Sequence, residues 1–176
     1  MAKKSDPAIF KSISELTDFG FVIIPLEKKV PILKKWNQIK KTPEHRYLFE
    51  KHNIGALTGE VSGITLLDID IKDDGMKQWK CLSSAYPEIH TPMVKSASGG
   101  IHIYFRYNNK LHSFSRFKLN GKYVGWDLLN NDRQAVVPPS KIGSRRYSWV
   151  VSLHEAKLAS MPKWLEDYLL LCKSFK

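Results

Sequence analysis

The stretch ITLLDIDIK, residues 64–72, constrains the fold and the chemistry of this 176-residue chain more than any other segment. Its Ile and Leu residues are typical of a buried strand, which we expect over residues 63–71. Asp68 and Asp70 interrupt the run, although aspartate disfavours strands and is rarely buried without a partner. Side chains at positions i and i+2 of a strand point to the same face. We therefore expect two carboxylates close together in an apolar and rigid setting.

Two carboxylates this close repel each other, so either one is protonated with a raised pKa or a cation lies between them. Hard divalent ions such as Mg²⁺ or Mn²⁺ take carboxylate oxygens and leave positions for phosphates and water. Asp-x-Asp alone is a weak signal, because it also marks strand ends and turns. Asp127, in VGWDLL, interrupts a second apolar segment and offers the third acid that a two-metal site needs. A strand-edge aspartate facing solvent is the plainer explanation of Asp127.

A glycine turn, Ser98-Gly99-Gly100, precedes the alternating segment IHIYFRY at residues 101–107. Glycine lacks the Cβ that would keep an anion away from backbone N–H groups, so the turn can face a phosphate. Ser98 and His102 can each hydrogen-bond a phosphate oxygen. A hairpin turn followed by a partly exposed histidine is the structural alternative.

Apolar periodicity and turn residues give the expected elements. Helices are predicted over residues 8–19, 43–52, 73–87 and 162–175, and strands over 21–26, 53–59, 63–71, 91–100, 101–107, 122–130, 134–140 and 145–152. Asp73 or Asp74 is expected to cap the helix at 73–87 rather than bind a ligand. Because short turns join several strands from residue 91 onward, an α+β fold with a mainly antiparallel sheet is favoured over a doubly wound parallel one. The length fits a single domain over residues 1–176.

The chain carries a formal net charge of +11, unevenly distributed. Residues 51–90 are slightly acidic, whereas residues 91–150 hold ten Lys and Arg against Asp127 and Asp132. Clustered basic residues favour a polyanion partner, although a basic surface can also serve solubility alone. The basic residues placed to follow a nucleic-acid backbone are Arg116, Lys118, Lys122, Lys141, Arg145 and Arg146. Tyr104, Phe105 and Tyr107 can stack on bases, but strand alternation favours core packing for at least half of them.

No apolar run of 18 residues predicts a transmembrane helix, and the N-terminal segment lacks the apolar stretch of a secretory signal. Cys81 and Cys172 are too few to suggest a disulfide framework or a zinc site. We expect a cytoplasmic protein without a membrane partner.

In order and spacing, Asp68-x-Asp70, Ser98-Gly99-Gly100-x-His102, Asp127 and the apolar run ending Pro138-Pro139-Ser140 resemble motifs of the archaeo-eukaryotic primase superfamily. They are most similar to its bifunctional primase-polymerase (Prim-Pol) branch of phages, viruses and plasmids. The upstream segment also resembles the family. It comprises Phe21–Pro25, Lys28 or Lys29, Pro31 and Trp36. The resemblance covers roughly residues 15–150, and the joint pattern is far more specific than its parts.

The resemblance implies an RRM-like catalytic sheet beside an N-terminal α/β unit. It also implies a DNA primase or DNA polymerase that extends or initiates strands on a single-stranded DNA template, using a primer strand and dNTP or NTP substrates. Asp68, Asp70 and Asp127 would bind two Mg²⁺ or Mn²⁺ ions, and His102 would act with them in catalysis. Ser98, Gly99, Gly100 and His102 would bind the triphosphate. Related proteins often continue into a helical priming domain and a helicase, which implies a helicase or replisome partner.

The chain departs from the family pattern after the third acid. An arginine and a glycine-rich turn often follow that acid, whereas this sequence has LLNNDRQ at 128–134. We expect Arg133 to serve the nucleotide phosphates from a shifted place, together with Lys141. Two alternatives remain open: a two-metal nuclease, which leaves the glycine turn without a role, and a non-catalytic single-stranded nucleic-acid-binding module, which has no use for acids in strand centres.

Overall fold

The computed structural model describes residues 7–115, 117–119 and 121–174. Three α-helices lie in this part of the chain: α1 (Pro7–Asp18), α2 (Gly75–Ser83) and α3 (Lys163–Ser174). Four single turns of 3₁₀-helix accompany them: η1 (Trp36–Gln38), η2 (Arg46–Leu48), η3 (Glu60–Ser62) and η4 (Lys72–Asp74). No helix among the described residues is both long and apolar enough to cross a membrane.

Two main sheets form the body of the protein. A five-stranded sheet has the order β13-β5-β6-β4-β9. Its strands are β4 (Ile64–Ile69), β5 (Met93–Lys95), β6 (Ile101–Arg106), β9 (Trp126–Leu129) and β13 (Ser148–Val151). A four-stranded sheet has the order β10-β3-β1-β2. Its strands are β1 (Ile23–Glu27), β2 (Val30–Pro31), β3 (Asn53–Leu57) and β10 (Gln134–Val136).

Two short hairpins complete the strands. They are β7 (Lys118–Leu119) with β8 (Lys122–Tyr123), and β11 (Lys141–Ile142) with β12 (Arg145–Arg146). All pairings between the named strands are antiparallel. The predicted α+β class with mainly antiparallel sheets is therefore confirmed.

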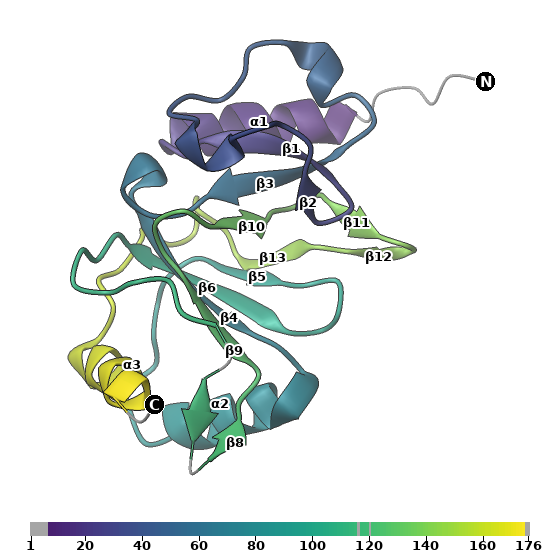
Figure 1. Cartoon of the computed structure of the whole chain (residues 1–176). Helices are drawn as coiled ribbons and strands as arrows, with labels where there is room; N and C mark the ends of the chain where they lie inside the picture. Colours follow the sequence, from purple (N-terminus) through teal and green to yellow (C-terminus); the bar gives the residue numbers. More distant parts are fainter. Residues whose placement is uncertain (1–6, 116, 120, 175–176) are drawn as a thin grey trace.

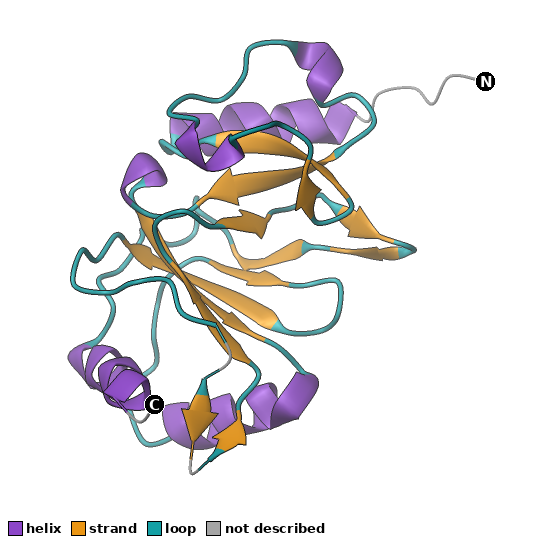
Figure 2. Ribbon diagram, in the orientation of Figure 1, coloured by secondary structure: helices purple, strands orange, loops and turns teal. Residues whose placement is uncertain are grey.

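The elements are arranged in four layers (Figures 1 and 2). Helix α1 covers the outer face of the four-stranded sheet, and α2 and α3 lie beyond the far face of the five-stranded sheet. One apolar core joins α1, the four-stranded sheet and the inner face of the five-stranded sheet. A second core lies between the five-stranded sheet and the helices α2 and α3.

Strand β4 is buried on both faces, which explains its almost continuous apolar sequence. Ile64 and Leu66 join the core between the sheets, whereas Leu67 and Ile69 join the core beneath α2 and α3. By this alternation Asp68 points into the space between the two sheets. The aromatic side chains Tyr104 and Phe105 are fully buried, as strand alternation favours for this segment.

Several helix and strand boundaries differ from those predicted from the sequence. The helix predicted over residues 43–52 is only the single turn η2, and the helix predicted over 73–87 is shortened to α2. The predicted strand 63–71 ends at Ile69, and 122–130 and 145–152 each divide into two shorter strands. Between the strand predicted over 21–26 and the helix predicted over 43–52, where no element is predicted, the structure contains β2 and η1. These differences lie where tertiary contacts, rather than periodicity, decide the local conformation.

Candidate active site

Three predicted site residues form one row across neighbouring strands. In the register of the five-stranded sheet, Asp68 on β4 lies directly opposite His102 on β6 and directly opposite Asp127 on β9. Directly opposed residues of antiparallel strands have side chains on the same face, with Cβ atoms about 5 Å apart. Asp68 Oδ1 lies 3.5 Å from His102 Nε2. Residues far apart in sequence are thus brought together on the face that looks toward the four-stranded sheet.

Asp70 joins this row from just beyond the end of β4. Its backbone N–H donates to the carbonyl of Gly125 at 2.6 Å, which ties the strand end to the segment before β9. A Cβ on Gly125 would lie 2.0 Å from the carbonyl oxygen of Lys72, and a Cβ on Gly100 would lie 2.3 Å from that of Ile69. Both positions therefore require glycine for close backbone approach.

The serine-glycine turn is the hairpin between β5 and β6. Ser98 Oγ donates to Asp70 Oδ1 at 3.3 Å and lies 2.9 Å from Ser96 Oγ. The backbone N–H of Gly99, at φ 101°, donates to the carbonyl of Ser96. The turn therefore lies beside the acids, where the sequence pattern places a phosphate contact.

The ionisation of the central pair is strongly perturbed. Burial raises the pKa of Asp68 to about 7, helped by the negative charges of Asp70 and Asp127. Burial lowers the pKa of His102 to about 4, so this imidazole is neutral at physiological pH. The positive charge of Lys29, in the turn between β1 and β2, lowers the pKa of both groups. His102 Nδ1 is buried and has no hydrogen-bond partner within the described structure.

Tyr147, between β12 and β13, borders the same site. Its ring centroid lies 5.6 Å from that of His102. Burial, with the negative charges of Asp68 and Asp70, raises the pKa of its phenol to about 12. Tyr147 is thus a protonated phenol close to the acids at neutral pH.

A pocket of about 270 Å³ opens over the acids. Its lining comprises Asp68, Asp70, Lys72, Asp73, Tyr123, Val124, Gly125, Trp126 and Asp127. Asp73 and Asp74 both adopt left-handed backbone conformations, and Asp74 makes no capping hydrogen bond with its side chain. Asp74 thus occupies the predicted N-cap position of α2 without a side-chain capping bond, whereas Asp73 lines the acid pocket.

Two other predicted phosphate contacts lie elsewhere. Arg133 follows the turn after β9, at the opposite end of that strand from Asp127, and lines a different pocket with Asn37, Lys40 and Asp132. Lys141 begins β11, where its backbone N–H donates to Asn53 Oδ1 at 3.0 Å. Neither residue is part of the acid pocket lining, so the predicted role of each stays a prediction. Arg116 lies outside the described residues.

The donor set suits a hard divalent ion, since Asp68, Asp70 and Asp127 supply only carboxylate oxygens. Burial, with the negative charges of Asp70 and Asp127, raises the pKa of Asp68, and a bound cation would stabilise its ionised form. In the described part of the chain, no group of three or more His, Cys, Asp or Glu side chains is arranged to hold a metal ion. The three carboxylates fit such an ion by the chemistry of their oxygens, although their arrangement here is not that of a metal site, so metal binding is a proposal.

Sequence reasoning missed Lys29, Lys72, Asp73, Tyr123, Gly125 and Tyr147 as neighbours of the acids. Gly125 could have been found, because a glycine two residues before an acid in an apolar strand marks close backbone approach. Tyr147 carries no local signal, and Lys29 lies in the upstream segment that resembles the family, but only the packing of the two sheets brings the charges of these residues near Asp68.

Comparison of the amino-acid sequence with protein-family models gives a match. Residues 14–164 match the family model of the bifunctional DNA primase/polymerase N-terminal domain, Prim-Pol. The curated proteins contain no match. Enzymes of the Prim-Pol family are nucleotidyltransferases that act on DNA and nucleotides and generally use divalent metal ions. Since the match covers most of the chain and the acids, the serine-glycine turn and His102 meet at one site, the protein belongs to the Prim-Pol family.

Proposed function

We propose that this protein is a DNA-dependent nucleotidyltransferase that extends or initiates strands on a single-stranded DNA template. The observation that carries the proposal is the row His102, Asp68 and Asp127 across three adjacent strands, with Asp70 and Ser98 beside it. In the reaction a 3′-hydroxyl forms a bond to the α-phosphate of the incoming nucleotide, and the bond to pyrophosphate breaks.

Each residue has a distinct part in this proposal. Asp68, Asp70 and Asp127 would hold two divalent ions, Mg²⁺ or Mn²⁺, which supply charge stabilisation at the attacking and leaving oxygens. His102, neutral because burial lowers its pKa to about 4, is a hydrogen-bond partner for a phosphate oxygen rather than a fixed charge. Ser98 and the backbone of Gly99 and Gly100 orient the triphosphate beside Asp70.

The cellular setting is part of the same proposal. A single catalytic domain over residues 1–176 would act in the cytoplasm, in replication of a phage, virus or plasmid. A helicase domain or another replisome partner would supply unwound template. Primer strand, template and dNTP or NTP are the substrates.

The test is primer extension on a primed single-stranded template with Mg²⁺ or Mn²⁺, with an unprimed template in parallel. Wild-type protein is compared with Asp68→Ala/Asp70→Ala. Metal-dependent extension that disappears in the double variant supports the polymerase, and product on the unprimed template adds primase activity.

Two other outcomes count against this function. Metal-dependent shortening of the template without any extension would indicate a nuclease. Neither extension nor cleavage, with single-stranded DNA bound equally well by both proteins, would indicate a binding module.

A further inference from the structure

A groove of about 340 Å³ lies beside α2, on the side of the five-stranded sheet that faces away from the four-stranded sheet. Its volume is in the usual range for small-molecule sites. Its lining includes the side chains of Trp79, Lys80, Tyr86, Ile89 and Met93, from the second half of α2 to the start of β5. Among the described residues, none lines both this groove and the acid pocket. The groove is therefore a second cavity, separate from the proposed catalytic site.

Three aromatic rings are stacked at this groove. Tyr86 and Trp164 of α3 are parallel, with ring centroids 4.2 Å apart and an angle of 3° between their planes. Trp164 in turn stacks on Trp79 of α2, with centroids 6.3 Å apart. Tyr86 is 41% exposed although Trp164 covers one face of its ring. The exposed ring therefore stands at the end of a stack, where another flat ring can be added.

Tyr86 is not needed to close the core beneath it. Leu165 and Leu169 of α3 are buried in the core between the five-stranded sheet and the helices, and the rings of Trp79 and Trp164 pack against this core. In the part of the chain that the structure describes, Tyr86 belongs to neither apolar core. Its ring is therefore available to a ligand in the groove.

Basic side chains border the groove. Lys80 lines it, and Lys77 is exposed three residues earlier on α2, on the same side of the helix. Glu88 lines the groove as well, and Lys163 of α3 is paired with Asp167. An exposed aromatic ring with nearby cations is typical of proteins that bind single-stranded nucleic acid, since rings stack on bases and cations follow the backbone. A DNA strand therefore fits this groove through both its bases and its charge.

The groove and the acid pocket lie at the two ends of α2. Lys72 and Asp73 of η4, just before α2, line the acid pocket, whereas the second half of α2 lines the groove. Trp126, in the lining of the acid pocket, donates its indole N–H to the carbonyl of Gly75 at 2.9 Å and meets Trp79 edge-on, with ring centroids 5.8 Å apart. The nine residues of α2 span about 13 Å. A DNA strand that leaves the acid pocket along this helix can therefore reach the groove.

We propose that the groove binds a base of single-stranded DNA, stacked on the exposed face of Tyr86, with Lys77 and Lys80 beside the neighbouring phosphates. This inference rests on the proposed function, because it takes single-stranded DNA as the substrate. The strand is then held at both ends of α2, by the acid pocket at one end and by the stacked ring at the other. Since every base has a flat face, this contact strengthens template binding without selecting a sequence.

The experiment measures binding of a labelled primed template to the full chain by fluorescence anisotropy, without nucleotide so that no turnover occurs. The template carries a single-stranded overhang, and a series of templates lacks one base of the overhang at a time. An abasic position removes a base and keeps its phosphate, so it tests stacking separately from charge. The ring variants are Tyr86→Ala and Tyr86→Phe, and circular dichroism melts check that each folds.

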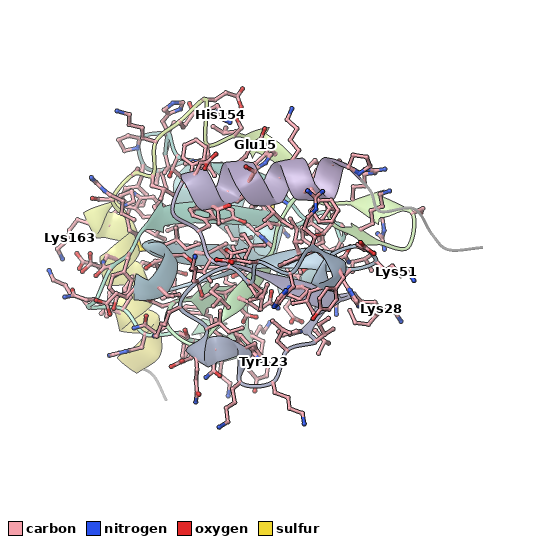
Figure 3. The ribbon with its side chains drawn as sticks, turned by 90° about the horizontal axis from the view of Figure 1, so that it is seen from above. Glu15, Lys28, Lys51, Tyr123, His154 and Lys163 are labelled. Carbon is pink, nitrogen blue, oxygen red and sulfur yellow. The ribbon has the colours of Figure 1, made fainter. Side chains whose placement is uncertain are left out.

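Lys80→Ala tests the charge at the groove, and Lys51→Ala is its matched control. Both lysines are exposed, and each change removes one positive charge. Figure 3 shows Lys51 on the side of the molecule opposite to Lys163 of α3, so the control lies away from the groove.

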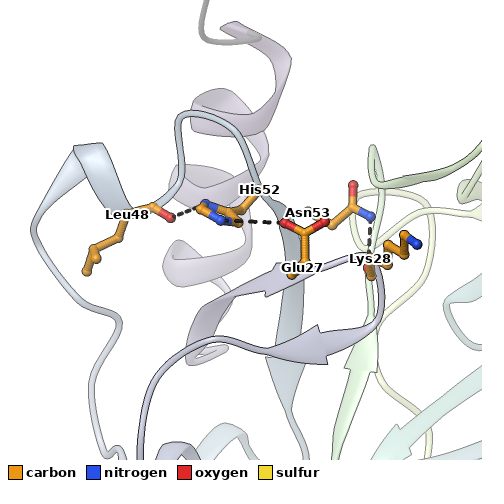
Figure 4. Close-up of polar contacts among 5 residues, drawn as sticks. All are labelled: Glu27, Lys28, Leu48, His52 and Asn53. Carbon is orange, nitrogen blue, oxygen red and sulfur yellow. Dashed lines mark hydrogen bonds and ion pairs between the residues drawn. The ribbon is translucent and has the colours of Figure 1, made fainter. Parts of the chain in front are cut away.

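Tyr47→Ala is the matched control for the ring. Tyr47 is 66% exposed on η2, so its removal also takes an aromatic ring from the surface. Contacts of other residues hold this turn, because His52 Nδ1 lies 3.0 Å from the carbonyl of Leu48 and His52 Nε2 lies 3.8 Å from Glu27 Oε2 (Figure 4). The path of the turn should therefore survive the substitution.

Tyr86→Ala is expected to weaken binding by about tenfold, the usual effect of losing one stack between a base and an aromatic ring. Tyr86→Phe and Tyr47→Ala should stay within about twofold of wild type. One overhang position should be sensitive to base removal in the wild type and insensitive in Tyr86→Ala. Lys80→Ala should reduce the slope of log K against log salt by about 0.7, and Lys51→Ala should leave it unchanged.

The wild type also gives a test that needs no substitution. Irradiation of 5-iodouracil at the sensitive overhang position should crosslink the DNA to Tyr86, which mass spectrometry of the digested protein identifies. A crosslink outside the groove would overturn the proposal, whether or not Tyr86→Ala folds.

Two further results would contradict the base contact. The first is equal binding by Tyr86→Ala and Tyr47→Ala, or an abasic series that does not separate wild type from Tyr86→Ala. The second is a wild type that light scattering shows to be a dimer and a Tyr86→Ala variant that is a monomer, with equal DNA binding by both. The groove would then be an interface between two copies of the chain.

Primer extension with the same proteins separates this inference from the proposed function. Tyr86-dependent DNA binding in a protein that extends no primer would keep the base contact and remove the polymerase. A wild type that extends primers while Tyr86→Ala binds DNA normally would remove the contact and keep the polymerase. Absence of binding to single-stranded DNA in the wild type would overturn this inference.

Discussion

Asp68 lies where burial and neighbouring negative charge both penalise its ionised form, so the stability of the metal-free protein should depend on its titration. Its pKa of about 7 exceeds the ordinary value of 3.8. Between these values the folded protein holds a proton that the unfolded chain has released, so the free energy of unfolding falls as pH rises through this window.

Asp68→Asn should remove this decrease in the free energy of unfolding with rising pH. In chelator, urea denaturation at pH 5 and pH 8 should show the variant more stable than wild type at pH 8 by about 1–2 kcal/mol. This figure is kept low because the side chain is about 30% exposed to solvent. If the difference in unfolding free energy between variant and wild type is the same at pH 5 and pH 8, the raised pKa of Asp68 is contradicted.

His102 has the opposite pH dependence. Its pKa is lowered from 6.5 to about 4, so the folded protein resists a proton that the unfolded chain accepts. The free energy of unfolding contributed by His102 therefore falls as pH drops from about 6.5 to 4. His102→Gln should be less sensitive to acid than wild type in the same denaturation series. If the variant loses as much unfolding free energy as the wild type between about pH 6.5 and 4, the imidazole is not buried as described.

At the level of elements, the sequence predicted the two acid-bearing strands and the turn before β6, because their apolar runs and glycines are local signals. It could not predict the register that sets Asp68 opposite both His102 and Asp127, since register depends on pairing between distant segments. The helix predicted over residues 43–52 is only the single turn η2, with Phe49 buried directly after it and Tyr47 exposed.

The backbone contact that positions Asp70 gives an element-level prediction. Gly125→Ala would place a Cβ 2.0 Å from the carbonyl oxygen of Lys72, so the segment before β9 must move. We expect a loss of about 1–3 kcal/mol in unfolding free energy, together with loss of activity because Asp70 moves with Gly125. Gly143→Asn is the control, since no heavy atom lies within 4 Å of the added Cβ there and asparagine tolerates left-handed φ. Equal thermal stability for the two variants would contradict the close approach.

At the level of the whole molecule, the hairpins β7–β8 and β11–β12 precede the two edge strands of the five-stranded sheet, β9 and β13. Tyr123 of β8 lines the acid pocket and Tyr147, directly after β12, lies against His102, so both hairpins adjoin the site. Exposed basic side chains on these hairpins are Lys118, Lys122, Arg145 and Arg146. The charge imbalance in the sequence predicted basic residues that follow a nucleic-acid backbone, but only the tertiary structure places these two hairpins beside the acids.

This arrangement predicts the salt dependence of template binding. Arg145→Ala/Arg146→Ala should reduce the slope of log K against log salt for single-stranded DNA, by about 0.7 for each phosphate that the variant no longer neutralises. Lys157→Ala/Lys163→Ala removes the same charge from exposed positions elsewhere and should leave the slope unchanged. Anisotropy with a labelled oligonucleotide at several salt concentrations measures both. The same change of slope in both double variants would mean that net charge alone, rather than the hairpin, binds DNA.

The central claim is that the cross-strand row is a nucleotidyl-transfer centre, and Asp127 tests it most directly because its strand pairing is the feature no local sequence signal supplied. The measurement is single-turnover incorporation of one nucleotide at a primer terminus by Asp127→Asn, which keeps size and removes charge. We predict a rate reduced by about a thousandfold or more, with single-stranded DNA binding within about twofold of wild type. A rate within about threefold of wild type would contradict the account.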